Sequence, residues 1–256
     1  MVKQQKKNTR FNKQTRRTDK AGFQQDQTKK VSIVPKHNNI EVIPRNVEQE
    51  KYLEMLNDPS KFVVVCTGRA GSGKTHLATL WAIQQYQMGK ADKIVITRPN
   101  VATDGMGIGF MPGTLIEKMW DWIGPFVDAF YQAGYSKIEL EKFLEIGVIE
   151  IIPIAFIRGR SLTDCVILAD ECQNLTKNSM LSILTRFGKN SKLVVIGDVK
   201  QSDLGRDNKN GLGDFIERFK SRVDSGVAVT SLTQCERHPV IQEILDVYEA
   251  NGVWDS

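Results

Sequence analysis

Short apolar runs alternate with amphipathic segments along most of the chain. Six such runs predict buried strands, at residues 62–66, 93–97, 148–152, 165–169, 192–196 and 227–229. Apolar residues at helical spacing predict helices at residues 47–56, 76–88, 114–134 (interrupted near Gly124–Pro125), 137–146, 176–187, 212–221 and 239–250. Thr176 and Gly188 are the predicted N-cap and C-cap of the helix at 176–187. Strands that are apolar throughout and alternate with helices are typical of a parallel sheet covered on both faces. The pattern therefore predicts an α/β fold.

The first 30 residues do not share this pattern. They contain ten Lys or Arg and two acidic residues, so they carry a net charge of +8, while the rest of the chain carries −3. Such a segment cannot bury enough apolar surface to fold. We therefore expect a disordered basic tail at residues 1–30, followed by one folded domain over residues 31–256. The tail is either an electrostatic arm for nucleic acid or a solubilising segment.

The cysteines and the apolar runs indicate the cellular setting. None of the four cysteines forms a C-x-x-C pair, and two lie in strand-like runs, so we expect buried, reduced thiols in an intracellular compartment. The apolar runs are too short to span a membrane, and the basic N-terminus lacks the apolar core of a secretory signal. A cytoplasmic protein without a membrane partner is the resulting expectation.

One segment matches the phosphate-binding P-loop, G-x-x-x-x-G-K-[ST], at every fixed position, and reads GRAGSGKT. A predicted strand precedes it and a predicted helix follows it. Glycines let successive backbone N–H groups surround a phosphate, and the helix N-terminus adds positive charge. Lys74 would neutralise the outer phosphates, and the Thr75 hydroxyl would coordinate Mg²⁺. The nucleotide-binding residues expected here are Gly68, Arg69, Ala70, Gly71, Ser72, Gly73, Lys74, Thr75 and His76.

A second group of polar residues follows two later strands. Asp170 and Glu171 come directly after the strand at 165–169, and ligands of open α/β sheets bind at this edge. Asp170 would hold Mg²⁺, and Glu171 would polarise the attacking water. Gln201, beyond the next strand, would report whether the terminal phosphate is still present. Taken alone, each of these is also compatible with a solvated turn or polar loop.

Gln49 and several arginines complete the candidate residues. The amide of Gln49 has the groups to read adenine, although a surface glutamine is the alternative. Phosphoryl transfer benefits from an arginine at the terminal phosphate, often from a neighbouring subunit, and Arg237 is the first choice. Arg158 and Arg160 are further candidates. Arg98, beyond the second strand, is a candidate contact for a nucleic-acid phosphate.

Six further segments carry a family resemblance. They are Thr97–Pro99, Gly109–Gly113, Pro153–Arg160, Asp170–Asn174, Gly197–Gln201 and Arg237–Val240. Together they resemble the PhoH family, over roughly residues 40–250. Two positions depart from the family pattern, since Cys172 replaces the usual alanine and Arg69 stands where proline is common. Neither position supplies a phosphate or metal ligand.

The resemblance implies a fold and an activity. PhoH-like proteins are bacterial and phage ATPases with a RecA-like core, similar to the first motor domain of superfamily-one helicases. The chain is therefore expected to be a RecA-like P-loop NTPase in the cytoplasm of a bacterial or phage-infected cell. Its cofactors would be ATP and Mg²⁺, and hydrolysis would be coupled to RNA or single-stranded nucleic acid. No second RecA-like domain fits in 256 residues, so we expect a homo-oligomeric ring with an arginine reaching across the interface.

Two other functions remain open. The basic tail also fits a nucleotide-gated RNA-binding or scaffold protein with little turnover. A small-molecule kinase is the third possibility, although the pair of Asp170 and Glu171 suits attack by water better than transfer to a metabolite.

Overall fold

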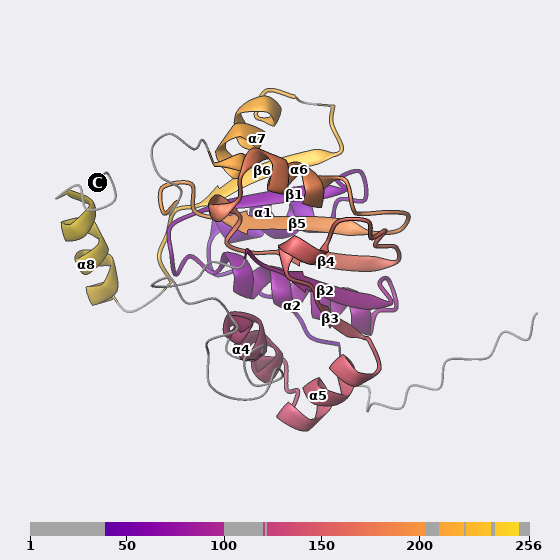
Figure 1. The fold of residues 1–256 in the computed structure, drawn as a ribbon. Coiled ribbons are helices and arrows are strands. Elements are labelled where there is room, and N and C mark those ends of the chain that lie inside the picture. The colour runs from indigo at the N-terminus through magenta and orange to yellow at the C-terminus, as the bar shows by residue number, and fades with distance from the viewer. Residues whose placement is uncertain are drawn as a thin grey trace, which may run out of the picture. The chain divides into compact units, whose positions relative to one another are not determined.

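Six parallel strands form one sheet in the order β3-β2-β4-β5-β1-β6 (Figure 1). The computed structural model describes residues 39–99, 120, 122–202, 210–222, 224–236 and 239–250. The strands are β1 Val63–Gly68, β2 Lys93–Thr97, β3 Ile149–Ile151, β4 Cys165–Ala169, β5 Lys192–Gly197 and β6 Val227–Leu232. The arrangement confirms the predicted RecA-like α/β fold. The predicted tail at residues 1–30 lies outside the described residues.

Helices cover both faces of this sheet. One face carries α1 Val47–Asn57, α2 Lys74–Gln87, α4 Gly124–Gln132 and α5 Lys137–Glu145. The other carries the short 3-10 helix η3 Ile154–Phe156, α6 Lys177–Leu184 and α7 Gly211–Phe219. Alternate residues of β1 enter the two cores, with Val64 on the α2 side and Val65 on the α7 side. A strand buried on both faces must be apolar at every position, which is why β1 reads as a continuous apolar run.

The last helix is α8, Pro239–Ala250, as the apolar spacing predicts. Among the described residues, no helix combines the length and the apolar character that crossing a membrane requires.

The structure differs from the predicted elements at α6. Thr176 caps this helix through a hydrogen bond from the Ser179 amide, as expected, but the helix ends at Leu184 instead of 187. Gly188 was predicted to cap it, and this is wrong. Residues 186–188 leave the helix because they exchange backbone hydrogen bonds with Leu162, at 3.0 Å from the Leu162 amide to the Arg186 carbonyl and 2.7 Å from the Gly188 amide back to Leu162. Contacts distant in sequence therefore decide where the helix ends.

The strand order brings the candidate chemistry to one edge. The carboxyl ends of β1, β5, β4 and β2 lie side by side, and they lead into the P-loop, Asp198, Asp170 and Arg98 respectively. Because β5 lies between β1 and β4, the loop after β5 lies between the P-loop and the acidic pair. The pairing of β2 with β4 continues one residue past the end of β4, since the Asp170 amide donates to the Thr97 carbonyl at 3.0 Å.

Gly68 closes β1 at the point where only glycine fits. It pairs with Leu232 of β6 and has a φ of 122°. A Cβ atom at this position would lie 1.9 Å from the Leu232 carbonyl oxygen. The backbone of β6 thus approaches β1 so closely that any side chain would push the two strands apart.

Replacing Gly68 by alanine should destabilise the fold. The substitution combines a strained backbone with a clash against main chain, so we expect the free energy of unfolding to fall by at least about 2 kcal/mol. Gly147 is the matched control because it also has a positive φ, 76°, but a Cβ there meets nothing within 4 Å. Gly147→Ala should cost only about 1 kcal/mol. Urea unfolding of both variants measures the difference, and equal losses would contradict the clash.

Candidate functional site

The P-loop turns from β1 into α2 through three glycines with left-handed backbone. Gly68, Gly71 and Gly73 have φ values of 122°, 79° and 87°. These conformations are unfavourable for other residues, which explains the glycine-rich sequence. Gly73 is the N-cap of α2, so the first amides of this helix face the pocket without intrahelical partners. The loop therefore has the backbone of an anion site.

Lys74 lies folded into the P-loop. Its Nζ donates to the carbonyls of Gly68 at 2.6 Å and Arg69 at 2.7 Å, and lies 3.4 Å from the Ser72 Oγ. The residue is 9% exposed, and this burial lowers the pKa of its ammonium. The cation is thus held by neutral oxygens at the place where phosphate oxygens would be stronger partners.

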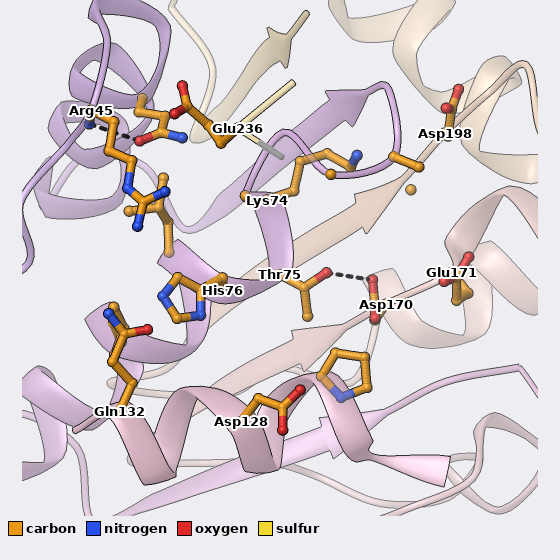
Figure 2. Close-up of a pocket in the computed structure, with 18 of the residues that line it drawn as sticks. Arg45, Lys74, Thr75, His76, Asp128, Gln132, Asp170, Glu171, Asp198 and Glu236 are labelled. Atoms are coloured by element: carbon orange, nitrogen blue, oxygen red, sulfur yellow. Dashed lines mark hydrogen bonds between the residues drawn. The ribbon is translucent and has the colours of Figure 1, made fainter. Parts of the chain in front are cut away.

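A hydrogen bond joins the P-loop to the acidic strand. Figure 2 shows the Thr75 hydroxyl directed at Asp170, with 3.1 Å between Oγ1 and Oδ1. Burial raises the pKa of Asp170 to about 6, and Arg98 acts in the opposite direction. A hydroxyl and a carboxylate in contact are hard oxygen ligands of the kind Mg²⁺ prefers, and this ion usually takes its other ligands from water and phosphates. The two residues therefore fit the predicted metal role.

Glu171 has a different environment from its neighbour. Its backbone is left-handed, with φ of 54° and ψ of 34°. One carboxylate oxygen accepts from the Gln173 Nε2 at 2.6 Å, and the other from the Arg98 Nη2 at 3.2 Å. The side chain is 42% exposed, against 5% for Asp170. Strained backbone at a polar site is often functional, and here it turns Glu171 toward the pocket that it helps to line.

Arg98 contacts the acidic pair, whereas the sequence suggested a nucleic-acid phosphate. Its Nε lies 3.6 Å from the Asp170 Oδ2, and its Nη2 forms the ion pair with Glu171. Its Nη1 also donates to the Trp122 carbonyl, just before α4. The motif Thr97–Pro99 marks this arginine in the sequence, but only the pairing of β2 with β4 shows where it lies.

The loop after β5 connects to the acidic pair through Gln173. The Asp198 amide donates to the Gln173 Oε1 at 3.1 Å, while the Gln173 Nε2 donates to Glu171. Gln201 and Asp198 both line the pocket. The predicted sensor and the predicted base thus belong to one hydrogen-bonded region, in which Gln173 has a role that the sequence did not assign.

Gln49, which lies in α1, holds the backbone of the P-loop through a hydrogen bond. It is 2% exposed, its Oε1 accepts from the Arg45 amide at 2.9 Å, and its Nε2 donates to the Ser72 carbonyl at 3.1 Å. A Cβ on Gly73 would lie 3.0 Å from the same Nε2. Both ends of the amide are therefore engaged with backbone in this structure. Its role in reading adenine stays a prediction.

These residues surround a cavity of about 640 Å³. Most of the predicted residues line it, namely Gln49, Ala70, Gly71, Gly73, Lys74, Thr75, His76, Asp170, Glu171 and Gln201. Gly68, Arg69 and Ser72 do not line it, and Arg69 instead forms an ion pair with Asp246 of α8 at 2.9 Å. Gly68 shapes the loop through its positive φ, and the Ser72 hydroxyl donates to the Arg69 carbonyl at 2.8 Å.

The opposite wall of the cavity was not predicted. Asp128 and Gln132 come from α4, and Figure 2 shows both below His76 and Thr75, on the side away from Lys74. Arg45 lines the same cavity from the segment before α1. Burial is the main cause that lowers the pKa of the His76 imidazole. No motif marks this wall, since it forms only when α4 packs against α2.

Arg158 and Arg160 do not line this cavity. Arg160 forms an ion pair with Glu150, and the Arg158 Nε lies 3.3 Å from the Ser182 Oγ. Arg237 lies outside the described residues. Its neighbour Glu236 lines the cavity and donates its amide to the Gly71 carbonyl at 3.0 Å. The choice of Arg237 as a trans arginine therefore stays a prediction.

Comparison with solved structures finds helicases at low similarity. The crystal structure of Pif1 helicase from Candida albicans is 17% identical, with a TM-score of 0.40, over 83% of this chain and 44% of that one. A Bacteroides Pif1 helicase in complex with ADP-AlF3 and ssDNA is 16% identical, with a TM-score of 0.37, over 83% and 47%. The fold assignment rests on the strand order above and not on these likenesses.

Comparison of sequences identifies the family. The chain is 37% identical to a PhoH-like protein of Mycobacterium tuberculosis over 205 residues, 80% of this chain and 57% of the relative. It is 35% identical to Protein PhoH of Escherichia coli over 208 residues, 81% and 58% respectively. The matched region thus spans less than two thirds of either relative. The family model described as PhoH-like protein matches residues 41–249. With its P-loop and its RecA-like fold, the chain belongs to the PhoH-like protein family.

Proposed function

We propose that this chain is a Mg²⁺-dependent ATPase whose turnover is coupled to RNA or other single-stranded nucleic acid. The observation that carries the ATPase proposal is the Thr75–Asp170 hydrogen bond, which brings the end of the P-loop and the acidic strand into one site. Glu171 follows Asp170 at the edge of the same cavity. A phosphate cradle, two oxygen ligands and an adjacent carboxylate are the groups that nucleotide hydrolysis requires.

Each residue has a role in this proposal. The P-loop amides and Lys74 bind the phosphates, and Lys74 exchanges its loop carbonyls for phosphate oxygens. Thr75 and Asp170 would hold Mg²⁺, which neutralises developing charge on the phosphates when bound. Glu171 accepts a proton from the attacking water, and Gln201 contacts the terminal phosphate. Arg237 of a neighbouring subunit would complete the charge stabilisation in a homo-oligomeric ring.

The nucleic-acid part of the proposal rests on charge. Residues 1–30 carry +8, while the remainder carries −3, so most of the attraction for phosphodiesters lies in the tail. The same charge supports the second candidate, a nucleotide-gated RNA-binding protein with little turnover. Whether nucleic acid changes the hydrolysis rate separates the two.

Glu171→Gln should preserve nucleotide binding and remove turnover. Glutamine keeps the size of the side chain but cannot accept the proton, so kcat should fall by about 10²- to 10⁴-fold, with the dissociation constant for ATP unchanged. A steady-state hydrolysis assay and fluorescent-nucleotide titration measure the two quantities. Normal hydrolysis by this variant would show that another group is the base.

Lys74 and Asp170 should affect binding in different ways. Lys74→Ala removes a phosphate partner, so nucleotide affinity should fall by more than about tenfold with or without Mg²⁺. Asp170→Asn should leave the affinity measured in EDTA unchanged and abolish its increase on adding Mg²⁺. Isothermal titration in both buffers tests this. A normal response of Asp170→Asn to Mg²⁺ would remove Asp170 from the metal site.

Removing residues 1–30 should weaken the response to nucleic acid. We expect single-stranded RNA to raise the hydrolysis rate of the full chain, and this stimulation to fall without the tail and at high salt. The rate without RNA should be the same for both chains. Salt-dependent RNA binding with no change in hydrolysis would favour the RNA-binding alternative. Equal stimulation of the two chains would show that the tail is incidental.

A further inference from the structure

The guanidinium of Arg98 contacts the predicted metal ligand, the predicted base and a backbone carbonyl. It forms ion pairs with Asp170 and Glu171, and it donates to the carbonyl of Trp122. Arg98 is 16% exposed and directly follows β2. The roles proposed for the ATPase residues do not include Arg98.

Of the two carboxylates, Glu171 depends more on such a partner. Asp170 is 5% exposed, and the Thr75 hydroxyl holds it. Glu171 is 42% exposed, so packing does not determine where its carboxylate lies. Among the described residues, two side-chain contacts do so, from Arg98 at 3.2 Å and from Gln173 at 2.6 Å. Loss of the Arg98 contact removes one of these two restraints from a flexible side chain next to solvent.

Arg98 is itself well placed to orient another group. Its backbone directly follows Thr97, which is fully buried and pairs with Ala169 of β4. The contact with the Trp122 carbonyl holds the other side of the guanidinium, just before α4. A planar group with several donors in fixed directions can bond to a carbonyl and a carboxylate at the same time. Arg98 therefore links the end of β2, the start of α4 and the carboxylate of Glu171.

We propose that Arg98 is a positioning residue for Glu171, which it holds at the angle from which the carboxylate reaches the attacking water. This inference rests on the proposed role of Glu171 as the base. Arg98 does not bind the nucleotide in this proposal, and it contacts no reacting atom. Its contribution is to the placement of the base, and a base misplaced by about 1 Å can lose about 10²-fold in rate.

The first test separates positioning from binding. Arg98→Ala should lower kcat by about 10- to 100-fold and leave KM for ATP within about twofold. Arg98→Lys should recover part of kcat, because an ammonium keeps the charge but lacks the planar guanidinium whose donors point at Glu171 and at the Trp122 carbonyl in fixed directions. Arg218→Ala is the matched control, since it breaks an arginine–carboxylate pair with Asp214 on the surface of α7. That variant should hydrolyse ATP normally.

The second test asks whether Arg98 acts through Glu171. In a Glu171→Gln background, Arg98→Ala should cause no further loss of the residual single-turnover rate. Independent losses that multiply would overturn the proposal, as would an unchanged kcat or a loss confined to KM. If Glu171→Gln is inactive and Arg98→Ala is normal, only this inference fails. If Glu171→Gln hydrolyses normally, the base assignment fails, and this inference fails with it.

Discussion

The site depends on one constraint, which is that the P-loop and the acidic pair must meet across an intervening strand. Because β5 separates β1 from β4, their axes lie about 10 Å apart. The first turn of α2 bridges this gap, and the Thr75 hydroxyl reaches Asp170 at 3.1 Å. If β1 and β4 were neighbours, no loop would lie between them; here the loop after β5 fills that place and carries Asp198 and Gln201 to the cavity. The sheet order therefore determines which polar groups share the cavity.

The charged groups of the cavity have hydrogen-bond or ion-pair partners within the protein. Lys74 bonds to the carbonyls of its own loop, and Arg98 lies against both carboxylates. Burial raises the pKa of Asp170 and lowers that of Lys74, since both charged forms lose hydration. On the proposed function, Lys74 would bind phosphate and Asp170 would help to hold Mg²⁺, while Arg98 stays on Glu171.

The elements themselves could be predicted well, and the exceptions have a common cause. Each strand contains a short apolar run, so the locations of the strands were evident from the sequence. The end of α6 was not, because the bridge between Leu162 and Phe187 competes with the helix for residues 186–188. β6 continues to Leu232, three residues past its apolar run, because β1 offers partners as far as Gly68. Prediction from the local sequence pattern was therefore wrong at the positions where pairing with residues distant in the chain decided the conformation.

The sequence alone determined the chemistry that depends on local order. The spacing of Gly71, Gly73, Lys74 and Thr75 along one turn predicts a phosphate cradle, and the strand before Asp170 and Glu171 marks these two acids. Only the tertiary structure decided how these groups combine. It turned Arg98 from a candidate nucleic-acid contact into the partner of both acids, and it placed the α4 wall across the cavity. The physical reason is that such contacts depend on strand order and helix packing, which join residues far apart in the chain and leave no periodic signal in it.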